Sequence, residues 1–546
     1  MKKIFRNKLY FLAVLLIVIG GLVCAGAGMA DEDREENDLA VSPGRALARK
    51  AAKPQQGWTT TDHSKHPALQ GEFRKGAEIT AACLSCHSEA ESQLHTTIHW
   101  TWVGYTDESG KRLGKAGDAL NNFCLSANSM QDKGCMACHP SWDGRKEVVN
   151  CLACHGQKNI NFGEAFEDYN AFADSDDPDE KEIAEEIQAN VLAAAQSIGR
   201  PTRQNCGECH FKGGGGDGVK HGDLDTSLTK PNKDLDVHMG VDGQNFECTR
   251  CHTTLEHNIA GRIYSKPAFT ERKSLIEDDL TPKITCESCH GSTPHEPGHK
   301  ANDHSDKVAC QSCHIPSFAR VNPTKMSWDW SQSGKLKDGK PYKEVGPLGK
   351  EDYLSIKGRM TWAKDVKPEY RWFDGSMKTL TVKDMIDPAT RVAVSAPVGD
   401  QGDPRSRIFP FKVHQGRQPY DKVHKALLAP LLSGKEGYWA TLDWPSALAK
   451  GQAALGVPFS GEYDFVESSY YLPTTHMVAP KQNVVGCIEC HVRTDGRLAS
   501  ITEVYLPGRD RLNLLDTLGW VAVLGSLLGV TLHGLGRVFT GGRKEE

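Results

Sequence analysis

Two long apolar segments stand near the ends of an otherwise polar chain. The first runs from Leu9 to Cys24 behind four basic residues, and small residues follow it up to Ala30, where an acidic stretch begins. A basic start, a short apolar run and a small-residue end predict a secretory signal peptide over residues 1–30. Cys24 would be removed with this peptide, because Gly21–Val23 lacks the pattern of a lipoprotein signal.

The second apolar segment, Leu514 to Val538, is long enough to cross about 30 Å of hydrocarbon and has basic residues on both sides. It predicts a single membrane anchor over residues 512–538, with residues 539–546 as a cytoplasmic tail. The alternative is a buried C-terminal helix. His533 lies inside this segment and is either a ligand of a membrane haem b or a polar residue at the helix end.

Helical periodicity between these segments is clearest over residues 180–199, where an acidic stretch passes into Ile, Val, Leu and Ala positions. Its acidic face is either solvated or a docking surface for a redox partner. Frequent Gly and Pro elsewhere, including Gly213–Gly216, indicate irregular backbone. We therefore expect a mainly α fold with extensive loops. A flexible linker over residues 31–60 would precede one large domain over residues 61–505.

Composition shows that something other than aliphatic side chains fills the interior. The 546 residues include 18 cysteines and 53 glycines, and the mean hydropathy is -0.48. A net charge of -5 is small for this length and gives no sign of a nucleic-acid partner. The spacing of the cysteines therefore carries the chemistry.

The motif Cys-x-x-Cys-His occurs eight times and uses sixteen of the 18 cysteines. Each copy can attach one haem through two thioether bonds and place its histidine under the iron as the proximal ligand. Zinc and redox-disulfide sites do not need a histidine at the fifth position every time. We predict eight stacked, covalently bound haem c groups in a multihaem cytochrome c fold. Motifs 1 to 8, in chain order, are Cys83-Cys86-His87, Cys135-Cys138-His139, Cys151-Cys154-His155, Cys206-Cys209-His210, Cys248-Cys251-His252, Cys286-Cys289-His290, Cys310-Cys313-His314 and Cys487-Cys490-His491.

Motif 8 is separated from the other seven by a long stretch without cysteine. This stretch is rich in large aromatic residues, and packing in the core is their first interpretation. The layout predicts a haem-dense first half and a protein-dense second half. The tryptophans concerned are Trp328, Trp330, Trp362, Trp372, Trp439 and Trp444.

Fourteen of the 22 histidines lie outside the motifs, which is more than eight distal positions need. Counting therefore leaves open whether one iron accepts a substrate. An iron between two histidines suits electron transfer, whereas a reducing site needs a labile distal ligand. As distal ligands we predict His99, His238, His257, His295, His304, His414 and His476.

Four stretches of the sequence resemble the octahaem tetrathionate reductase family of multihaem c-type cytochromes. They are Ala82–Ala90, Thr97–Trp102, Gly213–Asp225 and Tyr471–Pro480, so the resemblance spans most of the exported part of the chain. It implies that one haem has a lysine amine as its distal ligand and a cysteine close to the same iron.

The residues that match this family's lysine and cysteine are Lys220 and Cys124. The resemblance implies that they are catalytic and that motif 2 holds the active centre. Taken without the resemblance, Lys220 would be a solvated lysine and Cys124 an inert buried thiol. An anionic substrate also needs positive charge, and the nearby basic candidates are Arg145, Lys146, Lys212 and His221.

These features favour a membrane-anchored oxidoreductase at the periplasmic face of the cytoplasmic membrane. Its substrate would be a small sulfur or nitrogen species, with tetrathionate first and nitrite or hydroxylamine as alternatives. The competing hypothesis is a non-catalytic cytochrome that carries electrons from a quinol-oxidising membrane partner to periplasmic acceptors. Expected partners are a small anionic substrate, the membrane, and a quinol-linked cytochrome b subunit or other periplasmic cytochromes.

Overall fold

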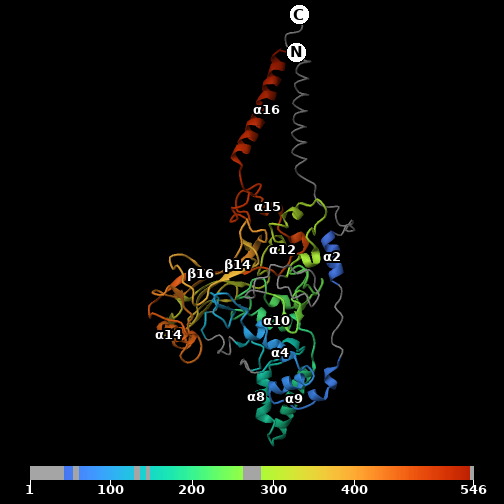
Figure 1. The fold of residues 1–546 in the computed structure, drawn as a ribbon, viewed down its shortest axis with the longest axis vertical. Coiled ribbons are helices and arrows are strands. Elements are labelled where there is room, and N and C mark those ends of the chain that lie inside the picture. The colour runs from blue at the N-terminus through green and yellow to red at the C-terminus, as the bar shows by residue number, and fades with distance from the viewer. Residues whose placement is uncertain are drawn as a thin grey trace.

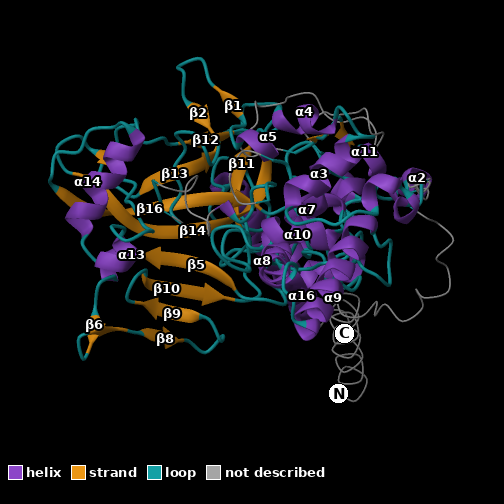
Figure 2. Cartoon of the chain, turned by 90° about the horizontal axis from the view of Figure 1, so that it is seen from below, coloured by secondary structure: helices purple, strands orange, loops and turns teal. Residues whose placement is uncertain are grey.

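The computed structural model describes residues 42–52, 61–123, 125–127, 136–142, 148–261 and 284–540, which include all 22 histidines. Figure 1 and Figure 2 show a helix-and-loop half beside a half dominated by one sheet, with a long helix extending from one end. The predicted signal peptide, residues 1–30, lies outside the described residues, and so do Cys124 and Cys135.

The first half consists of short helices and 3-10 turns joined by loops. Its elements are α2 (Pro43–Ala51), η1 (His63–Lys65), η2 (Pro67–Leu69), α3 (Gly76–Leu84), α4 (Ala90–His95), α5 (Ile98–Thr101), β1 (Tyr105–Thr106), β2 (Arg112–Leu113), α7 (Leu152–His155), α8 (Phe162–Phe172), α9 (Pro178–Gln196), α10 (Arg203–His210), η3 (Thr226–Thr229), η4 (Cys248–Arg250), β3 (Thr254–Leu255), β4 (Asn258–Ile259), α11 (Glu287–His290), η5 (Lys300–His304) and α12 (Cys310–His314).

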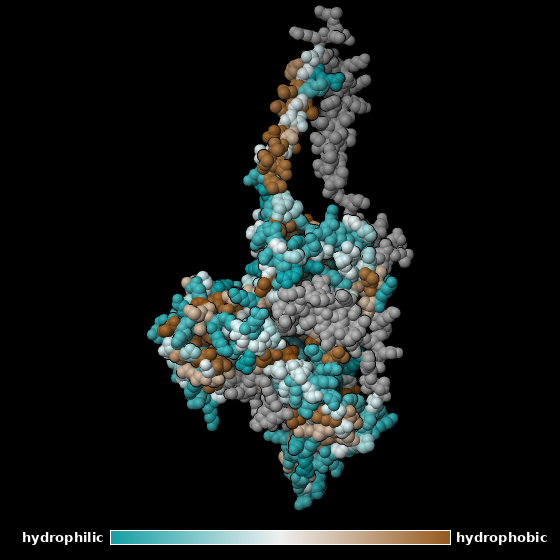
Figure 3. Space-filling model, viewed as in Figure 1, coloured by the Kyte–Doolittle hydropathy of each residue, from teal (hydrophilic) through white to brown (hydrophobic). Residues whose placement is uncertain are grey.

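The predicted helix over 180–199 is confirmed as α9, which begins two residues earlier. Asp177 caps its first turn by accepting a hydrogen bond from the backbone N–H of Asp179. Val191 and Ala195 are fully buried in a cluster with Ile79. The acidic side faces outward beside α8 at the end of the molecule opposite the long helix (Figure 1, Figure 3).

Part of the stretch expected to be a flexible linker, residues 31–60, is folded. Residues 43–51 form α2, and the backbone N–H of Gly44 donates to the carbonyl of Pro294 at 3.1 Å. A Cβ at Gly44 would lie 2.5 Å from the Cβ of Pro294, so glycine permits this close approach. The sequence did not predict that residues 43–51 are folded, because their packing partner, Pro294, is about 250 residues further along the chain.

The expected mainly α fold is wrong for the second half, which forms a ten-stranded mixed sheet in the order β12-β13-β16-β14-β5-β10-β9-β8, with β11 and β15 also paired to β14. Alternating buried and exposed aromatic and β-branched residues favour strands here. Its elements are β5 (Thr324–Asp329), η6 (Trp330–Gln332), β8 (Lys343–Val345), β9 (Glu351–Leu354), β10 (Gly358–Ala363), β11 (Glu369–Phe373), β12 (Met377–Thr379), β13 (Val392–Pro397), β14 (Arg407–Asp421), β15 (Ala426–Leu427), α13 (Tyr438–Thr441), α14 (Trp444–Leu455) and β16 (Tyr463–Pro473), with the separate hairpin β6 (Leu336–Lys337) and β7 (Lys340–Pro341), then η7 (Lys481–Asn483) and α15 (Cys487–Cys490).

Aromatic side chains close the core of the sheet half, as their abundance predicted. The rings of Trp328 and Trp330 stack at 4.6 Å, and those of Tyr438 and Trp444 at 4.1 Å. All four are buried in one cluster. The sheet half is therefore a conventional apolar core packed beside the motif-bearing half.

Asp421 at the end of β14 is a buried carboxylate whose replacement by alanine should destabilise this core. It accepts hydrogen bonds from the backbone N–H of Val423, His424 and Ser460 at 2.7–2.9 Å and from the Ser460 hydroxyl at 2.9 Å. Four partly buried donors would lose their acceptor, so we expect Asp421→Ala to lower the free energy of unfolding by about 3 kcal/mol in urea titrations. A loss no larger than that of the exposed control Asp464→Ala would contradict this account.

These hydrogen bonds also hold the pKa of Asp421 well below its ordinary value of 3.8. A carboxyl with a lowered folded-state pKa stabilises the fold above its unfolded pKa. The contribution of Asp421 should therefore be complete near neutral pH and be lost as the pH falls below 3.8.

The chain ends in α16 (Asn513–Thr540), which contains the predicted anchor residues and is exposed along its whole length. Among the described residues it is the one helix long and apolar enough to span a membrane. Figure 3 shows its hydrophobic surface rising away from the body. His533 lies on this helix.

Candidate functional site

Apart from motif 2, whose Cys135 lies outside the described residues, the motifs lie on or at the end of short helices or 3-10 turns. Residues three and four apart share a helix face, so the two thiols of α12 point the same way and His314 follows on that side. In α10, Thr202 and Asn205 form a capping box that fixes the start of the helix carrying motif 4. Local sequence therefore suffices to build each attachment unit.

Seven motif histidines face a second histidine ring at a nearly constant distance. A metal–imidazole nitrogen bond is about 2.0 Å long, so two rings on opposite sides of one iron should have centroids about 6 Å apart. The observed centroid distances are 6.0–6.4 Å in the pairs His63–His87, His257–His155, His99–His210, His476–His252, His238–His290, His295–His314 and His304–His491.

Hydrogen bonds fix several of these rings so that Nε2 remains for the iron. The Nδ1 atoms of His155, His252 and His491 lie 2.8–3.1 Å from the backbone carbonyls of Gly199, Ala260 and Pro507, respectively. A carbonyl accepts from Nδ1–H, which leaves the lone pair on Nε2.

The distal ring of His476 is oriented by a carboxylate instead. Nδ1 of His476 lies 3.2 Å from Oδ2 of Asp223, which is 3 % exposed. The same oxygen accepts from the backbone N–H of Thr475 at 2.7 Å. This ion pair and these hydrogen bonds outweigh the cost of burying Asp223, lower its pKa and raise that of His476.

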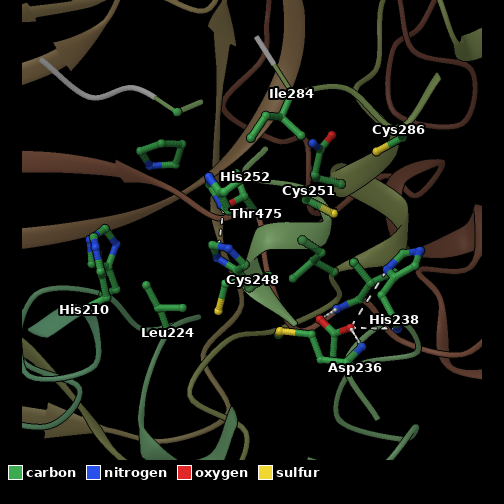
Figure 4. A pocket seen from close by; sticks show the side chains of 18 of the residues that line it. His210, Leu224, Asp236, His238, Cys248, Cys251, His252, Ile284, Cys286 and Thr475 are labelled. Carbon is green, nitrogen blue, oxygen red and sulfur yellow. Dashed lines mark hydrogen bonds and ion pairs between the residues drawn. The ribbon is translucent and has the colours of Figure 1, made fainter. Parts of the chain in front are cut away.

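The space between the rings fits large planar groups. One continuous cavity of about 4180 Å³ contains seven of the motif histidines, whereas an ordinary ligand pocket holds about 300–1,000 Å³. Figure 4 shows part of it, lined by the imidazoles of His210, His238 and His252 and by the thiols of Cys248, Cys251 and Cys286. In the described part of the chain no three His, Cys, Asp or Glu side chains gather as they would around zinc. The side chains therefore fit haem.

Cysteines of different motifs interact with one another, and these interactions give the order of the motifs in space. Hydrogen bonds join Cys83 to Cys151, Cys138 to Cys209, Cys206 to Cys248 and Cys286 to Cys310. Electrostatic contacts link Cys154 to Cys206, Cys251 to Cys286 and Cys313 to Cys490. The sites form a row in the order 1, 3, 4, 5, 6, 7 and 8, and motif 2 branches from motif 4.

The structure brings six of the seven predicted distal histidines to a motif histidine: His99, His238, His257, His295, His304 and His476. The seventh, His414, lies elsewhere, buried on β14 with Nδ1 2.8 Å from Oδ1 of Asn122. The place opposite His87 is taken by His63, which the sequence argument missed. His63 lies 20 residues before Cys83 of motif 1, and nothing in its local sequence marks it as a ligand.

Motif 2 has different surroundings. The ring of His139 contacts Trp100 and Trp102, with centroids 4.7 and 5.3 Å away. Trp102 has a positive φ of 54°, a conformation that bulky residues rarely adopt. Aromatic rings thus adjoin His139, and its Nε2 lies 2.9 Å from the carbonyl of Trp100.

Lys220 lies in the glycine-rich loop between α10 and η3. Its Nζ is 5.7 Å from the centre of the Phe123 ring, and it lines the same cavity as His139 and Cys138. Burial, and secondarily the charge of Lys115, lowers the pKa of Lys220 from 10.5 to about 8. An amine in this state readily supplies its lone pair to a metal.

Side chains of the sheet hold the backbone of the loop that carries Lys220. Lys412 on β14 is 1 % exposed, and its Nζ donates to the carbonyls of Val219 and Lys220, both at 3.0 Å. It also donates to Oγ1 of Thr324 at 2.5 Å, which in turn donates to the carbonyl of Gly218 at 2.6 Å. Two strands therefore hold the loop that carries Lys220.

Two lysines give motif 2 a positively charged environment, and one of them, Lys212, was among the predicted basic residues. Lys115 and Lys212 both act electrostatically on Cys138, and Lys115 Nζ lies 4.2 Å from the Trp102 ring centre. Lys212 also pairs with Glu208 at 2.6 Å. The sequence argument missed Lys115, which carries no motif.

The other basic candidates contribute less. Burial lowers the pKa of His221 well below its usual value, so this side chain is neutral. Arg145 and Lys146 lie outside the described residues.

Comparison with known proteins agrees with this geometry. The family model described as Cytochrome c bacterial matches residues 325–494. A solved structure, octahaem cytochrome c from Shewanella oneidensis, has 36% sequence identity and a TM-score of 0.65, and the match covers 79% of this chain and 94% of that chain. A search of curated proteins found no match.

Proposed function

Because this chain belongs to the octahaem cytochrome c family, we propose that it is a reductase with eight haem c groups and a catalytic site at motif 2. The chain is a multihaem c-type cytochrome with covalently bound haem and a redox role. The proposal adds export to the periplasm, anchoring through α16, and reduction of a small sulfur or nitrogen species such as tetrathionate.

The observation that carries the proposal is the placement of Lys220. Its buried amine, with a pKa near 8, interacts electrostatically with Lys115, which also acts on Cys138 of motif 2. Seven histidine pairs suit irons that only pass electrons, whereas an amine is a weaker ligand that a substrate can displace. Lys220 would thus hold the iron of motif 2 until substrate arrives.

The charge around motif 2 supports an anionic substrate. Bound haem would supply the electrons, and the chain's own residues bind and orient the substrate. Tetrathionate takes up two electrons, its central sulfur–sulfur bond breaks, and two thiosulfate dianions form without any proton. The negative charge rises from two to four, so Lys115, Lys212 and a displaced, protonated Lys220 stabilise the products more than the substrate.

Reduced methyl viologen assays on the exported domain test the proposal with tetrathionate, nitrite and hydroxylamine. Turnover of at least one substrate, faster at low ionic strength for an anion, is the expected result. If the protein oxidises reduced viologen with none of the three, it is an electron carrier, and the row of histidine pairs is its whole function.

The ligand exchange at motif 2 should depend on pH. Only the neutral amine has a free lone pair, so protonation of Lys220, with a pKa near 8 before metal binding, releases it from the iron. We expect one ferric EPR signal to change as the pH falls from 9 to 5, with an apparent pKa below 8 because the iron stabilises the neutral amine. The seven histidine-paired signals serve as internal controls. A spectrum that is constant over this range would contradict lysine ligation.

A further inference from the structure

Motif 8 lies directly beneath the candidate membrane helix. Nδ1 of His491 donates to the carbonyl of Pro507 at 2.9 Å. Gly508, with a φ of +87°, packs so closely that a Cβ there would lie 2.6 Å from the carbonyl oxygen of His491. Because α16 starts five residues later, the helix begins within about 17 Å of this contact.

The segment between motif 8 and α16 is firmly held. Arg509 donates to the carbonyls of Leu498 at 2.9 Å and Val504 at 2.7 Å, and also to that of Ile501. It pairs with Asp510 at 2.6 Å. The orientation of motif 8 relative to the start of α16 is therefore fixed by several hydrogen bonds rather than by a loose tether.

Three large apolar side chains are exposed around this segment. Ile488 is 79 % exposed, Tyr505 56 % and Leu512 48 %, and we call these three residues the stem face. Single exposed apolar residues are ordinary, but Ile488 belongs to α15, which lies at the base of α16 (Figure 1), and Tyr505 and Leu512 belong to the segment that leads into this apolar helix. Tyrosine at the base of a membrane span is typical of the lipid headgroup level.

The row of motifs ends at this face. The backbone N–H of Val485, just before motif 8, donates to the carbonyl of Cys313 of motif 7 at 2.9 Å, so motif 7 is its neighbour in the row. At the other end, Cys83 of motif 1 packs with Val191 of α9. Figure 1 shows α9 and α16 at opposite ends of the molecule.

We propose that the stem face rests on the lipid surface, which makes motif 8 the membrane-side end of the row and motif 1 its periplasmic end. The inference depends on the proposed function only in taking α16 as the anchor. Ile488 and Leu512 gain by leaving water, while the exposed Arg511 lies near the lipid phosphates. Electrons from a quinol oxidised in the bilayer would then reach motif 8 first.

Hydroxyl-radical footprinting of the full chain tests this contact. The probe is a nanodisc of phosphatidylethanolamine and phosphatidylglycerol that holds one chain, and the matched control is Ile183 of α9, which is 45 % exposed. We expect Ile488 to be oxidised at least about fivefold more slowly than Ile183 despite its greater exposure. The proposal would be overturned if Ile488 and Ile183 were oxidised in proportion to their exposed fractions. It would also be overturned if Ile488 were protected in lipid-free amphipol as strongly as in the nanodisc.

Ile488→Glu provides a second test that does not endanger haem attachment, since motifs 4 and 6 already carry Glu208 and Glu287 between their cysteines. A carboxylate beside anionic lipid should move the stem face away from the lipid surface and raise the oxidation rate of Tyr505 about threefold. Ile183→Glu should leave the oxidation rate of Tyr505 unchanged. Equal effects of the two variants would refute lipid contact. Activity with reduced viologen, measured on the same samples, reports separately on the proposed function.

Discussion

Replacing Lys220 with leucine is expected to lower kcat for tetrathionate reduction by about 100-fold or more, the usual effect of losing a group that acts in the transition state. Leucine fills similar space but provides neither a ligand for the iron of motif 2 nor a cation for the thiosulfate that forms. One ferric EPR signal should change at the same time. The seven signals from histidine pairs should remain, because each of those irons would have two imidazole ligands and Lys220 belongs to none of the pairs.

Lys435→Leu, at an exposed lysine of the sheet half, is the matched control for loss of charge. It should leave kcat and the spectrum unchanged. Full activity of the Lys220 variant would move the catalytic site away from motif 2. An altered spectrum with unchanged kcat would make Lys220 a ligand without a catalytic role.

Lys412→Met is expected to lower kcat about tenfold by moving Lys220 rather than by touching substrate. Burial lowers the pKa of Lys412 well below its usual range, yet its amine still donates to the carbonyls of Val219 and Lys220. Methionine leaves these two carbonyls and Thr324 without their donor, which should also cost about 2–4 kcal/mol of stability. The EPR signal of motif 2 should broaden as the position of Lys220 becomes less defined.

The control for Lys412 is Lys378→Met, on strand β12 of the same sheet and exposed. The spectroscopic readout separates positioning from stability. If Lys412→Met lowers the Tm but keeps the wild-type signal and kcat at a temperature where it is folded, the buried amine serves only the sheet.

The sequence could predict the attachment chemistry because that chemistry is local. Two thiols and a histidine within five residues determine where a haem is bound, and α12 shows that one helical turn is enough to align them. The acidic helix α9 and the apolar helix α16 were predictable for the same reason, since their patterns repeat along continuous segments.

The distal ligands depend on contacts between distant segments, so residue type alone could not assign them. His414 lies on β14 with Nδ1 against Asn122 and Nε2 buried without a hydrogen-bond partner, and it is not one of the seven paired histidines. His63 was overlooked, yet the packing of η1 brings it opposite His87. The sheet was missed because short alternating stretches in a loop-rich sequence give a weak signal, whereas pairing such as β14 with β16 supplies most of the stabilisation.

The large cavity has a consequence for how the protein is made. The attachment cysteines and ligand histidines line this cavity, so the haems themselves would supply much of the core of the first half. Haem attachment must therefore precede folding of the first half, while each cysteine thiol is still accessible to the enzymes that attach the haem. Cells short of haem should degrade the newly exported chain rather than accumulate a partly loaded, partly active form.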